Sequence, residues 1–344
     1  MWSFALLGVL VTCVSARAIL DAPPTRQSPP QGATTVCQDG CTFKKIQSAI
    51  DSLQDSASAD HTVFIFPGTY TEQVTIPAMK GKLTIAGWTS NTLSADANTV
   101  TIQSGAFEAR NPSVSSPTAD ESTATVINRA ARSALYNLNI RNTHGGDEQA
   151  VALAALNDRQ GYYGLGVFGR SNTLLAQTGA QLYARCTIQG VNDFIYGQHA
   201  RVLISQAAVA VAGTGGGSIT ASGRADSADP GMMVLDRCSV QAAAGSNVAS
   251  QSVFLGQPWG PWARVTVQKS ELGGLIAPAG WTSWSQGGSN TQHAAFDEVD
   301  NTGPGASGYR AVFASRLAVA VTPEAVLGGD YKDWTDQYYY SPGS

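Results

Sequence analysis

The sequence carries little charge and no excess of basic residues. Asp, Glu, Lys and Arg make up 13% of its 344 residues, and the formal net charge is -4 at pH 7. Domains that bind nucleic acid present clustered Lys and Arg, so we expect no nucleic-acid partner. Low charge together with 36 glycines also excludes a coiled coil or a disordered polymer and is typical of a turn-rich β protein.

Long hydrophobic runs are missing except at the N-terminus. Residues 2–16 form a short apolar stretch, and the small-residue pattern Ala16-Arg17-Ala18 that follows is typical of signal-peptide cleavage. The stretch is too short to span a bilayer, so we expect residues 1–18 to be a secretory signal peptide rather than a membrane anchor. No later segment reaches about 18 uncharged apolar residues, so we expect a secreted protein with no membrane partner.

Cysteine is also scarce, with five residues, and Cys13 lies within the expected signal peptide. Cys37 and Cys41, in CQDGC, share one tight turn, and we expect theirs to be the only intramolecular disulfide, if any forms. A zinc site would need further ligands at matching spacing, which are lacking. The segment HGGDE (144–148) superficially suggests a metal site, but we interpret it as an exposed turn. We expect no metal ion and no cofactor.

From residue 62 the sequence becomes a series of short β-prone runs separated by glycines and polar turns, with no strong helix between them. The runs LYARCTIQG, VLISQAAVA and VLDRCSVQA share one template, and a unit that recurs roughly every 20 to 30 residues is the signature of a solenoid. The alternative is a β-sandwich, whose Asn-Gly and Asp-Gly hairpin signals are nearly absent here. The pattern therefore predicts an all-β protein, a right-handed parallel β-helix.

The repeat template also places the two remaining cysteines. Cys186 and Cys238 occupy the same template position, with Ala207 of a whole intervening coil between them. Coils about 4.8 Å apart separate these cysteines by roughly 10 Å, whereas a disulfide needs Cα atoms within about 7 Å. We therefore expect no bridge between them.

The regions that flank the repeats have different expected structures. Residues 19–35 form a polar, proline-rich connector that we expect to have no fixed structure. In FKKIQSAIDSL (43–53) the apolar residues recur at helical spacing, which predicts a short helix that caps one end of the β-helix. We expect the β-helix domain to cover 36–344, with the polar, glycine-rich residues 286–344 returning along its outside.

One carboxylate lies in a costly setting. Asp193 interrupts an apolar, β-prone run in GVNDFIYG, between Gly190 and Gly197. Burying a carboxylate costs free energy, so a specific role is expected for this side chain.

Seven segments, in order along nearly the whole chain, resemble the pectin methylesterases, carbohydrate esterases of the plant cell wall built on a right-handed parallel β-helix. They are GTYTEQV (68–74), QAVAL (149–153), GVNDFIYG (190–197), ITASGR (219–224), LGQPWG (255–260), IAPAGWTSW (276–284) and NTGPGA (301–306). The resemblance implies an extracellular protein that removes methyl groups from the methyl-esterified homogalacturonan of pectin. We expect it to be a monomer.

The family's mechanism assigns roles to five positions. One aspartate attacks the ester carbonyl, a second acts as acid and base, two glutamines bind the oxyanion, and an arginine holds the nucleophile ionised. Asp193 matches the nucleophile and Gln149 one oxyanion donor. Ser171 and Asn172, in SNTL, replace the second glutamine and the acid–base aspartate, and Gln257, in LGQPWG, replaces the arginine. We expect all five around one groove on the side of the β-helix.

Three aromatic residues near these positions are candidates to contact sugar rings, namely Trp259, Trp262 and Phe194. Trp259 is the best candidate to stack on a sugar face, because it closely follows the arginine position of the motif. Ordinary packing is the alternative role for each of them.

The substitutions predict impaired or lost catalysis. Loss of a general acid–base group costs roughly 10² to 10⁴ in rate, and loss of one oxyanion donor costs about 10² to 10³. Two functions remain open: a slow esterase, and a silent protein that binds homogalacturonan or a protein partner. A β-helix lyase would need an acidic calcium cluster beside a basic residue, and the matched segments contain none.

Overall fold

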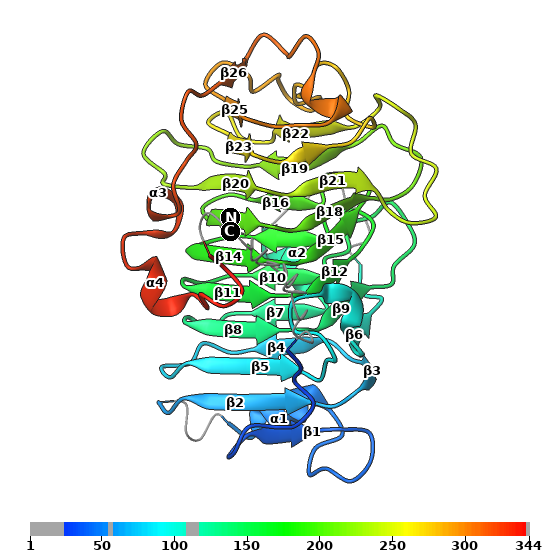
Figure 1. The fold of residues 1–344 in the computed structure, drawn as a ribbon, viewed down its shortest axis with the longest axis vertical. Coiled ribbons are helices and arrows are strands. Elements are labelled where there is room, and N and C mark those ends of the chain that lie inside the picture. Colours follow the sequence, from blue (N-terminus) through cyan, green and yellow to red (C-terminus); the bar gives the residue numbers. More distant parts are fainter. Residues whose placement is uncertain (1–23, 54–57, 108–116, 342–344) are drawn as a thin grey trace, which may run out of the picture.

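The computed structural model describes residues 24–53, 58–107 and 117–341, so the expected signal peptide lies outside the described residues. The chain winds through coils that stack along one long axis, and strands of adjacent coils pair in parallel (Figure 1). The right-handed parallel β-helix predicted from the repeats is confirmed.

Three sheets run along the stack. The first has 11 strands: β1 (Thr34–Val36), β2 (His61–Ile65), β5 (Leu83–Gly87), β8 (Ser133–Tyr136), β11 (Gln160–Tyr163), β14 (Ala180–Ala184), β17 (Arg201–Ser205), β20 (Met232–Asp236), β23 (Arg264–Gln268), β25 (Ala295–Val299) and β26 (Ala314–Arg316). The second has eight: β3 (Gly68–Thr71), β6 (Val100–Ser104), β9 (Asn139–Asn142), β12 (Gly166–Phe168), β15 (Thr187–Gly190), β18 (Ala208–Val211), β21 (Ser239–Ala242) and β24 (Glu271–Leu272). The third has seven: β4 (Val74–Ile76), β7 (Val126–Asn128), β10 (Leu153–Ala155), β13 (Leu174–Ala176), β16 (Ile195–Gly197), β19 (Ser218–Ser222) and β22 (Phe254–Pro258).

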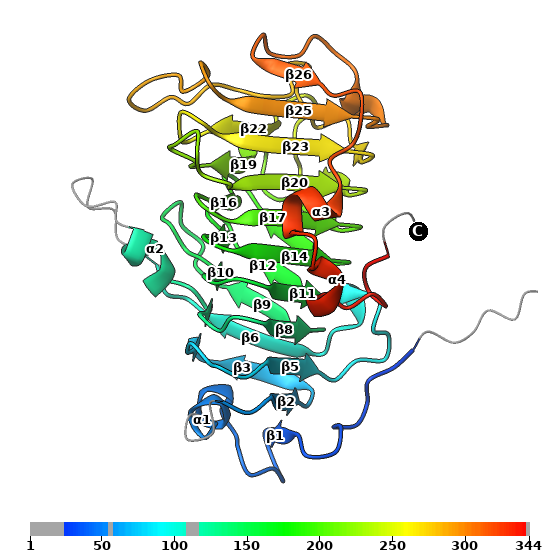
Figure 2. The same ribbon diagram turned by 90° about the vertical axis from the view of Figure 1, so that its left-hand side faces the viewer.

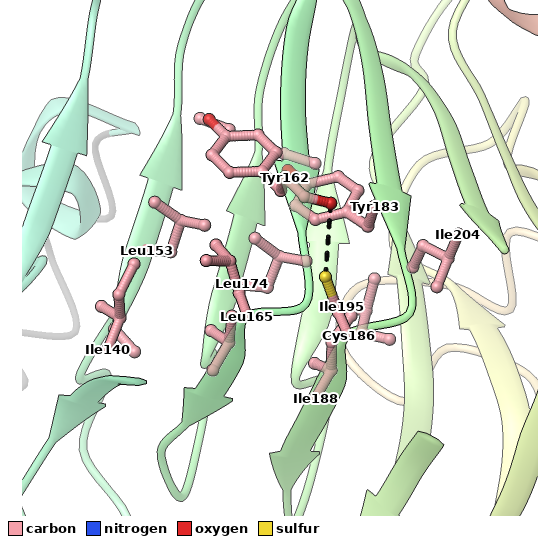
Figure 3. Close-up of a cluster of buried hydrophobic side chains, with 14 of the residues drawn as sticks. Ile140, Leu153, Tyr162, Leu165, Leu174, Tyr183, Cys186, Ile188, Ile195 and Ile204 are labelled. Atoms are coloured by element: carbon pink, nitrogen blue, oxygen red, sulfur yellow. Dashed lines mark hydrogen bonds between the residues drawn. The ribbon is translucent and has the colours of Figure 1, made fainter. Parts of the chain in front are cut away.

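The interior of the stack is filled by apolar side chains that repeat from coil to coil. Leu153, Leu174 and Ile195 occupy one register position on three successive coils and are fully buried. Figure 3 shows them in the same interior as Tyr162 and Tyr183, whose rings stack with centroids 4.7 Å apart. Burial of matching residues on neighbouring coils explains why one template recurs in the sequence.

The cysteine predictions are confirmed. Cys37 and Cys41 form a disulfide, and Cys186 and Cys238 are free and buried. The register places Ala207 between the two free cysteines, one coil from each.

The capping helix is confirmed, but it is shorter than expected. Helix α1 (Ile46–Asp51) begins three residues after Phe43, which instead forms a parallel bridge with Val36. The carboxylate of Glu72 accepts hydrogen bonds from the first two backbone N–H groups of α1, at 2.9 and 3.0 Å. This external acceptor satisfies N–H groups that have no partner within the helix and thereby fixes where the helix begins.

The described part of the proline-rich connector is held against the coils. The backbone of Arg26 pairs with that of Thr89, and its guanidinium donates to the side chains of Asn137 and Tyr339. The expectation of no fixed structure is therefore wrong for residues 24–35.

The C-terminal region differs from its prediction in its first half. β25 and β26 add two strands to the first sheet, so residues 286–316 extend the stack rather than return along it. From residue 317 the chain does return along the outside, through α3 (Pro323–Leu327) and α4 (Tyr331–Trp334), against the first sheet (Figure 2). There it buries a second apolar cluster, which includes Tyr163, Leu182, Leu203, Val326, Leu327, Tyr331, Tyr339 and Tyr340.

The other helical segments in the described residues are α2 (Pro117–Ser122) and the 3-10 turns η2 (Ala95–Ala97) and η3 (Pro304–Ala306). Within the described ranges, every helix is too short or too polar to cross a membrane.

Candidate active site

Two of the expected site residues occupy equivalent turns that lead from the second sheet into the third. Asn172 lies two residues before β13, and Asp193 lies two residues before β16. Since Leu174 pairs with Ile195, Asn172 and Asp193 lie side by side on neighbouring coils. Both have left-handed backbones, with φ of 57° and 45°. Asn and Asp tolerate this conformation better than most residues, so the turn favours the residue types found there.

The Asp193 carboxylate is held by neutral amides. The Nε2 atom of Gln257 lies 2.8 Å from each carboxylate oxygen, and the Nδ2 atom of Asn192 donates to Oδ2 at 3.0 Å. The side-chain Oδ1 atom of Asn192 in turn accepts a hydrogen bond from the backbone N–H of Ser218, at 3.0 Å. These contacts fix the orientation of the carboxylate without supplying a positive charge.

The electrostatic consequence is a weakened acid. Burial raises the pKa of Asp193 to about 6, and the hydrogen bonds from Gln257 and Asn192 lower it only in part. None of the ion pairs found among the described residues includes Asp193. A cation in hydrogen-bond contact would favour the ionised carboxylate more strongly than a neutral amide does.

Gln149 and Ser171 lie on the same side of the stack as Asp193. Gln149 comes four residues before β10, and Ser171 comes three residues before β13, on the next coil. Ser171 forms a parallel bridge with Asn192, so its backbone adjoins the turn that carries Asp193. Gln149, Ser171, Asn172 and Asp193 therefore lie on three consecutive coils. Gln257, on β22, contacts Asp193.

Of the aromatic candidates, two are accessible and one is not. Trp259 is half-buried beside Tyr196, with ring centroids 6.3 Å apart, and Trp262 stacks on His293 at 4.2 Å. Phe194 is fully buried in the interior core. Its assignment as a substrate contact is wrong, because the residue after Asp193 faces the opposite side of the chain and fills the coil.

Sequence reasoning missed Asn192. This residue is exposed, its side-chain amide donates to Asp193, and its side-chain oxygen accepts a hydrogen bond from Ser218 on the next coil. The signal available was a second polar residue beside Asp193 in an apolar run.

The segment at 144–148 is an ion-paired turn. His144 contacts Glu148 at 2.8 Å, and exposed Asp147 pairs with Arg170. Across the residues that the structure describes, His, Cys, Asp and Glu form no group of three or more that could hold a metal ion.

Comparison with known proteins agrees with this architecture. The family model described as Pectinesterase matches residues 33–327. The chain belongs to the pectinesterase family. It is 42% identical over 336 residues to a pectinesterase of Aspergillus aculeatus, which covers 97% of this chain and 99% of the relative. A pectinesterase of Aspergillus niger is 40% identical over 334 residues, covering 96% of this chain and 98% of that one.

Solved structures of the family have the same fold. The pectin methylesterase of Aspergillus niger, in deglycosylated form, matches with a TM-score of 0.82 and 35% identity, covering 92% of this chain and all of that one. The pectin methylesterase of carrot matches with a TM-score of 0.76, 23% identity and 92% coverage of this chain. The pectinesterase-family fold is therefore preserved over almost the whole chain.

Proposed function

We propose that this protein acts on methyl-esterified homogalacturonan with strongly impaired demethylation. The substrate class is that of the pectinesterases to which the chain is 40 to 42% identical over nearly their full length. The proposal includes secretion into the extracellular space, which rests on the apolar segment within residues 1–18, and function as a monomer.

One observation supports the impairment most directly: the double contact of Gln257 Nε2 with both oxygens of Asp193. An ester hydrolase that uses a carboxylate nucleophile needs an ionised oxygen and a nearby acid for the leaving group. Here the group that contacts both oxygens is a neutral amide and not a cation, so burial keeps the pKa of Asp193 at about 6, which leaves the carboxyl largely protonated in mildly acidic solution. The neighbouring side chain, Asn172, cannot donate and recover a proton as a carboxyl does.

The ester carbonyl would be attacked by Asp193, with Gln149 as the remaining amide donor for the oxyanion and Ser171 as a weaker one. Trp259 and Trp262 would contact sugar rings. The departing methoxide would take its proton from water and not from a general acid of the protein, which by itself costs roughly 10² to 10⁴ in rate. A second water molecule would then hydrolyse the anhydride formed with Asp193 and release the free carboxylate.

The second candidate is a catalytically silent protein that binds homogalacturonan or a protein partner. It is supported by the same differences from the family pattern, together with the hydrogen bonds that hold Asp193 in one orientation.

The deciding experiment measures methanol release and binding on the same preparations. Wild type, Asp193→Ala and an active family member are compared on highly methyl-esterified pectin. We expect wild type to bind pectin and to release methanol at least about 10³-fold more slowly than the active relative, since an acid–base group and an oxyanion donor are both replaced.

The outcome for Asp193→Ala separates the two candidates. If it abolishes the residual release, the protein is a slow esterase. If wild type and Asp193→Ala both stay at background while pectin binds, the protein is a silent binder. Turnover by wild type at the rate of the active relative would refute the impairment, and failure to bind pectin would refute both candidates.

A further inference from the structure

Gly223 lies next to Trp259 on the outside of the third sheet. Gln198, Gly223 and Trp259 directly follow β16, β19 and β22, strands that lie one above another in Figure 2. Because these strands pair in parallel register, the three residues occupy equivalent positions on successive coils. A side chain at position 223 would therefore project between those of Gln198 and Trp259.

The indole of Trp259 occupies the space that a side chain at position 223 would need. A Cβ on Gly223 would lie 2.6 Å from Cζ3 of Trp259, closer still to its Cε3, and 2.8 Å from Cγ of Gln198. Carbon atoms in favourable contact are about 3.5 to 4.0 Å apart. The φ of Gly223 lies outside the left-handed region, so its backbone does not need glycine. The need for glycine at this position comes from the neighbouring side chains, and above all from the ring.

Further contacts hold Trp259 in place. The side-chain amide of Asn290, in the segment that precedes β25, donates to the Trp259 carbonyl oxygen at 2.8 Å. The ring adjoins the apolar cluster that includes Leu175, Tyr196 and Ala221, outside the interior core, and it remains half-buried. Part of the indole is thus packed against the sheet, while the rest stays accessible to a ligand.

A ring held in this way is prepared for binding. An aromatic side chain that is already fixed loses less conformational freedom when a ligand packs on it. Ordering one side chain on binding changes a dissociation constant by about 2- to 12-fold. A residue that fixes the ring can therefore change affinity without contacting the ligand.

We propose that Gly223 is a positioning residue for Trp259. Its missing side chain lets the indole pack against the third sheet, in the orientation in which it binds a sugar ring of homogalacturonan. A methyl group at position 223 would push the ring off the sheet and let it move between rotamers. The inference rests on the proposed function, because it takes Trp259 to contact sugar rings.

Calorimetric titration with a fully methyl-esterified galacturonate oligomer tests the inference. Gly223→Ala should weaken binding about 2- to 12-fold, and Trp259→Ala should weaken it at least as much. In the double variant Gly223→Ala/Trp259→Ala, the change at position 223 should add no loss to that of Trp259→Ala, because the ring through which it acts is gone.

Gly274→Ala is the matched control. The φ of Gly274 also lies outside the left-handed region, and the nearest described atom to a Cβ there is Cβ of Pro304, at 3.8 Å. This variant adds the same methyl group without a clash, so it should bind the oligomer as wild type does.

Near-ultraviolet circular dichroism supplies a readout that a purely structural role of Gly223 would not change. The difference between wild type and Trp259→Phe isolates the signal of this ring, which requires a fixed, asymmetric environment. Gly223→Ala should lose this signal and keep its far-ultraviolet spectrum, whereas Gly274→Ala should keep both.

The possible failures are distinguishable. If wild type binds the oligomer but Gly223→Ala or Trp259→Ala binds equally well, the inference is overturned and the proposed function stands. An equal loss from Gly223→Ala with and without Trp259 would also overturn it, since the effect would not pass through the ring. If wild type does not bind the oligomer, both the inference and the proposed function are overturned.

Thermal unfolding establishes whether each variant is folded. If Gly223→Ala does not fold, the double variant decides the question. A folded double variant would show that the added methyl group clashes with the ring of Trp259, which supports the inference. A double variant that also fails to fold would show that the coils themselves require the glycine, which overturns it.

Discussion

At the residue scale, the chemistry depends on how Asp193 is held. The carboxylate is half-buried, and within the described part of the chain its side-chain donors are the amides of Gln257 and Asn192. The amides satisfy its oxygens, yet its pKa stays raised at about 6 because burial outweighs them.

This pKa predicts a pH-dependent cost in stability. Between the ordinary pKa of 3.8 and about 6, the folded protein binds a proton at Asp193 that the unfolded chain has already lost. Raising the pH through this window therefore lowers the free energy of unfolding, by about 2 to 3 kcal/mol in total. The cost is fully present above about pH 7 and absent below about pH 3.

Asp193→Asn removes this titration. As the pH rises from about 4 to about 7.5, the wild type should lose about 2 to 3 kcal/mol of unfolding free energy relative to Asp193→Asn. Urea unfolding at several pH values measures it. Asp300→Asn is the control, because Asp300 is exposed and shares the left-handed backbone, with φ of 51°. A difference for Asp193→Asn that does not vary with pH would contradict the raised pKa.

At the element scale, the strand that follows Asp193 depends on its final glycine. Gly197 has a φ of 157°, and a Cβ placed on it would lie 1.7 Å from the carbonyl oxygen of Ala176 on the preceding coil. Backbone atoms cannot move aside as a flexible side chain can. The spacing of the two coils at this edge of the third sheet is thus set by the absence of a side chain.

Gly197→Ala should therefore destabilise the fold by at least about 3 kcal/mol, through strain and separation of the coils. Urea unfolding gives the value. Gly329→Ala is the matched control, because an added Cβ there meets no atom within 4 Å, and it should change stability by less than about 0.5 kcal/mol. Equal effects of the two substitutions would contradict the close approach.

The elements also show what the sequence could predict. The solenoid and the coil between Cys186 and Cys238 followed from the repeat, because register is imposed by burial of matching residues on every coil. The start of α1 could not be predicted, because its cap comes from Glu72, 26 residues from Ile46. The burial of Phe194 follows from the alternation of side chains along and beside a strand, because Asp193 faces outward and its neighbour therefore faces the core.

At the scale of the whole molecule, the site exists only because the coils stack. Asn172, Asp193 and Gln257 lie on different coils and are brought together by strand register and by the reach of Gln257 from β22. On the opposite flank, the returning C-terminal segment buries Tyr339 against Asn137 and Arg26, which ties both ends of the described chain to the middle of the stack. Ser171, Asn172 and Gln257 are not part of the buried core, so we expect the stack to tolerate their replacement.

If the proposed impairment holds, replacing these three residues should raise the esterase activity without rebuilding the fold. Asn172→Asp supplies a carboxyl beside Asp193, in a left-handed backbone that Asp tolerates, and two neighbouring carboxyls raise one pKa, as an acid requires. Gln257→Arg places a cation where Nε2 now contacts both oxygens, and Ser171→Gln supplies the second oxyanion donor. Groups that act as a unit gain little from single replacements, so each single variant should remain near wild type.

The triple variant should release methanol from esterified pectin about 10³-fold faster than wild type or more, in line with the restored acid and oxyanion donor. Adding Asp193→Ala to it should return release to background, because the gain requires this nucleophile. Steady-state methanol release by the triple and quadruple variants measures both effects. A triple variant that binds pectin yet remains inactive would show that the Asp193 surface has changed in shape as well as in chemistry. The protein would then be a homogalacturonan-binding protein rather than a disarmed esterase.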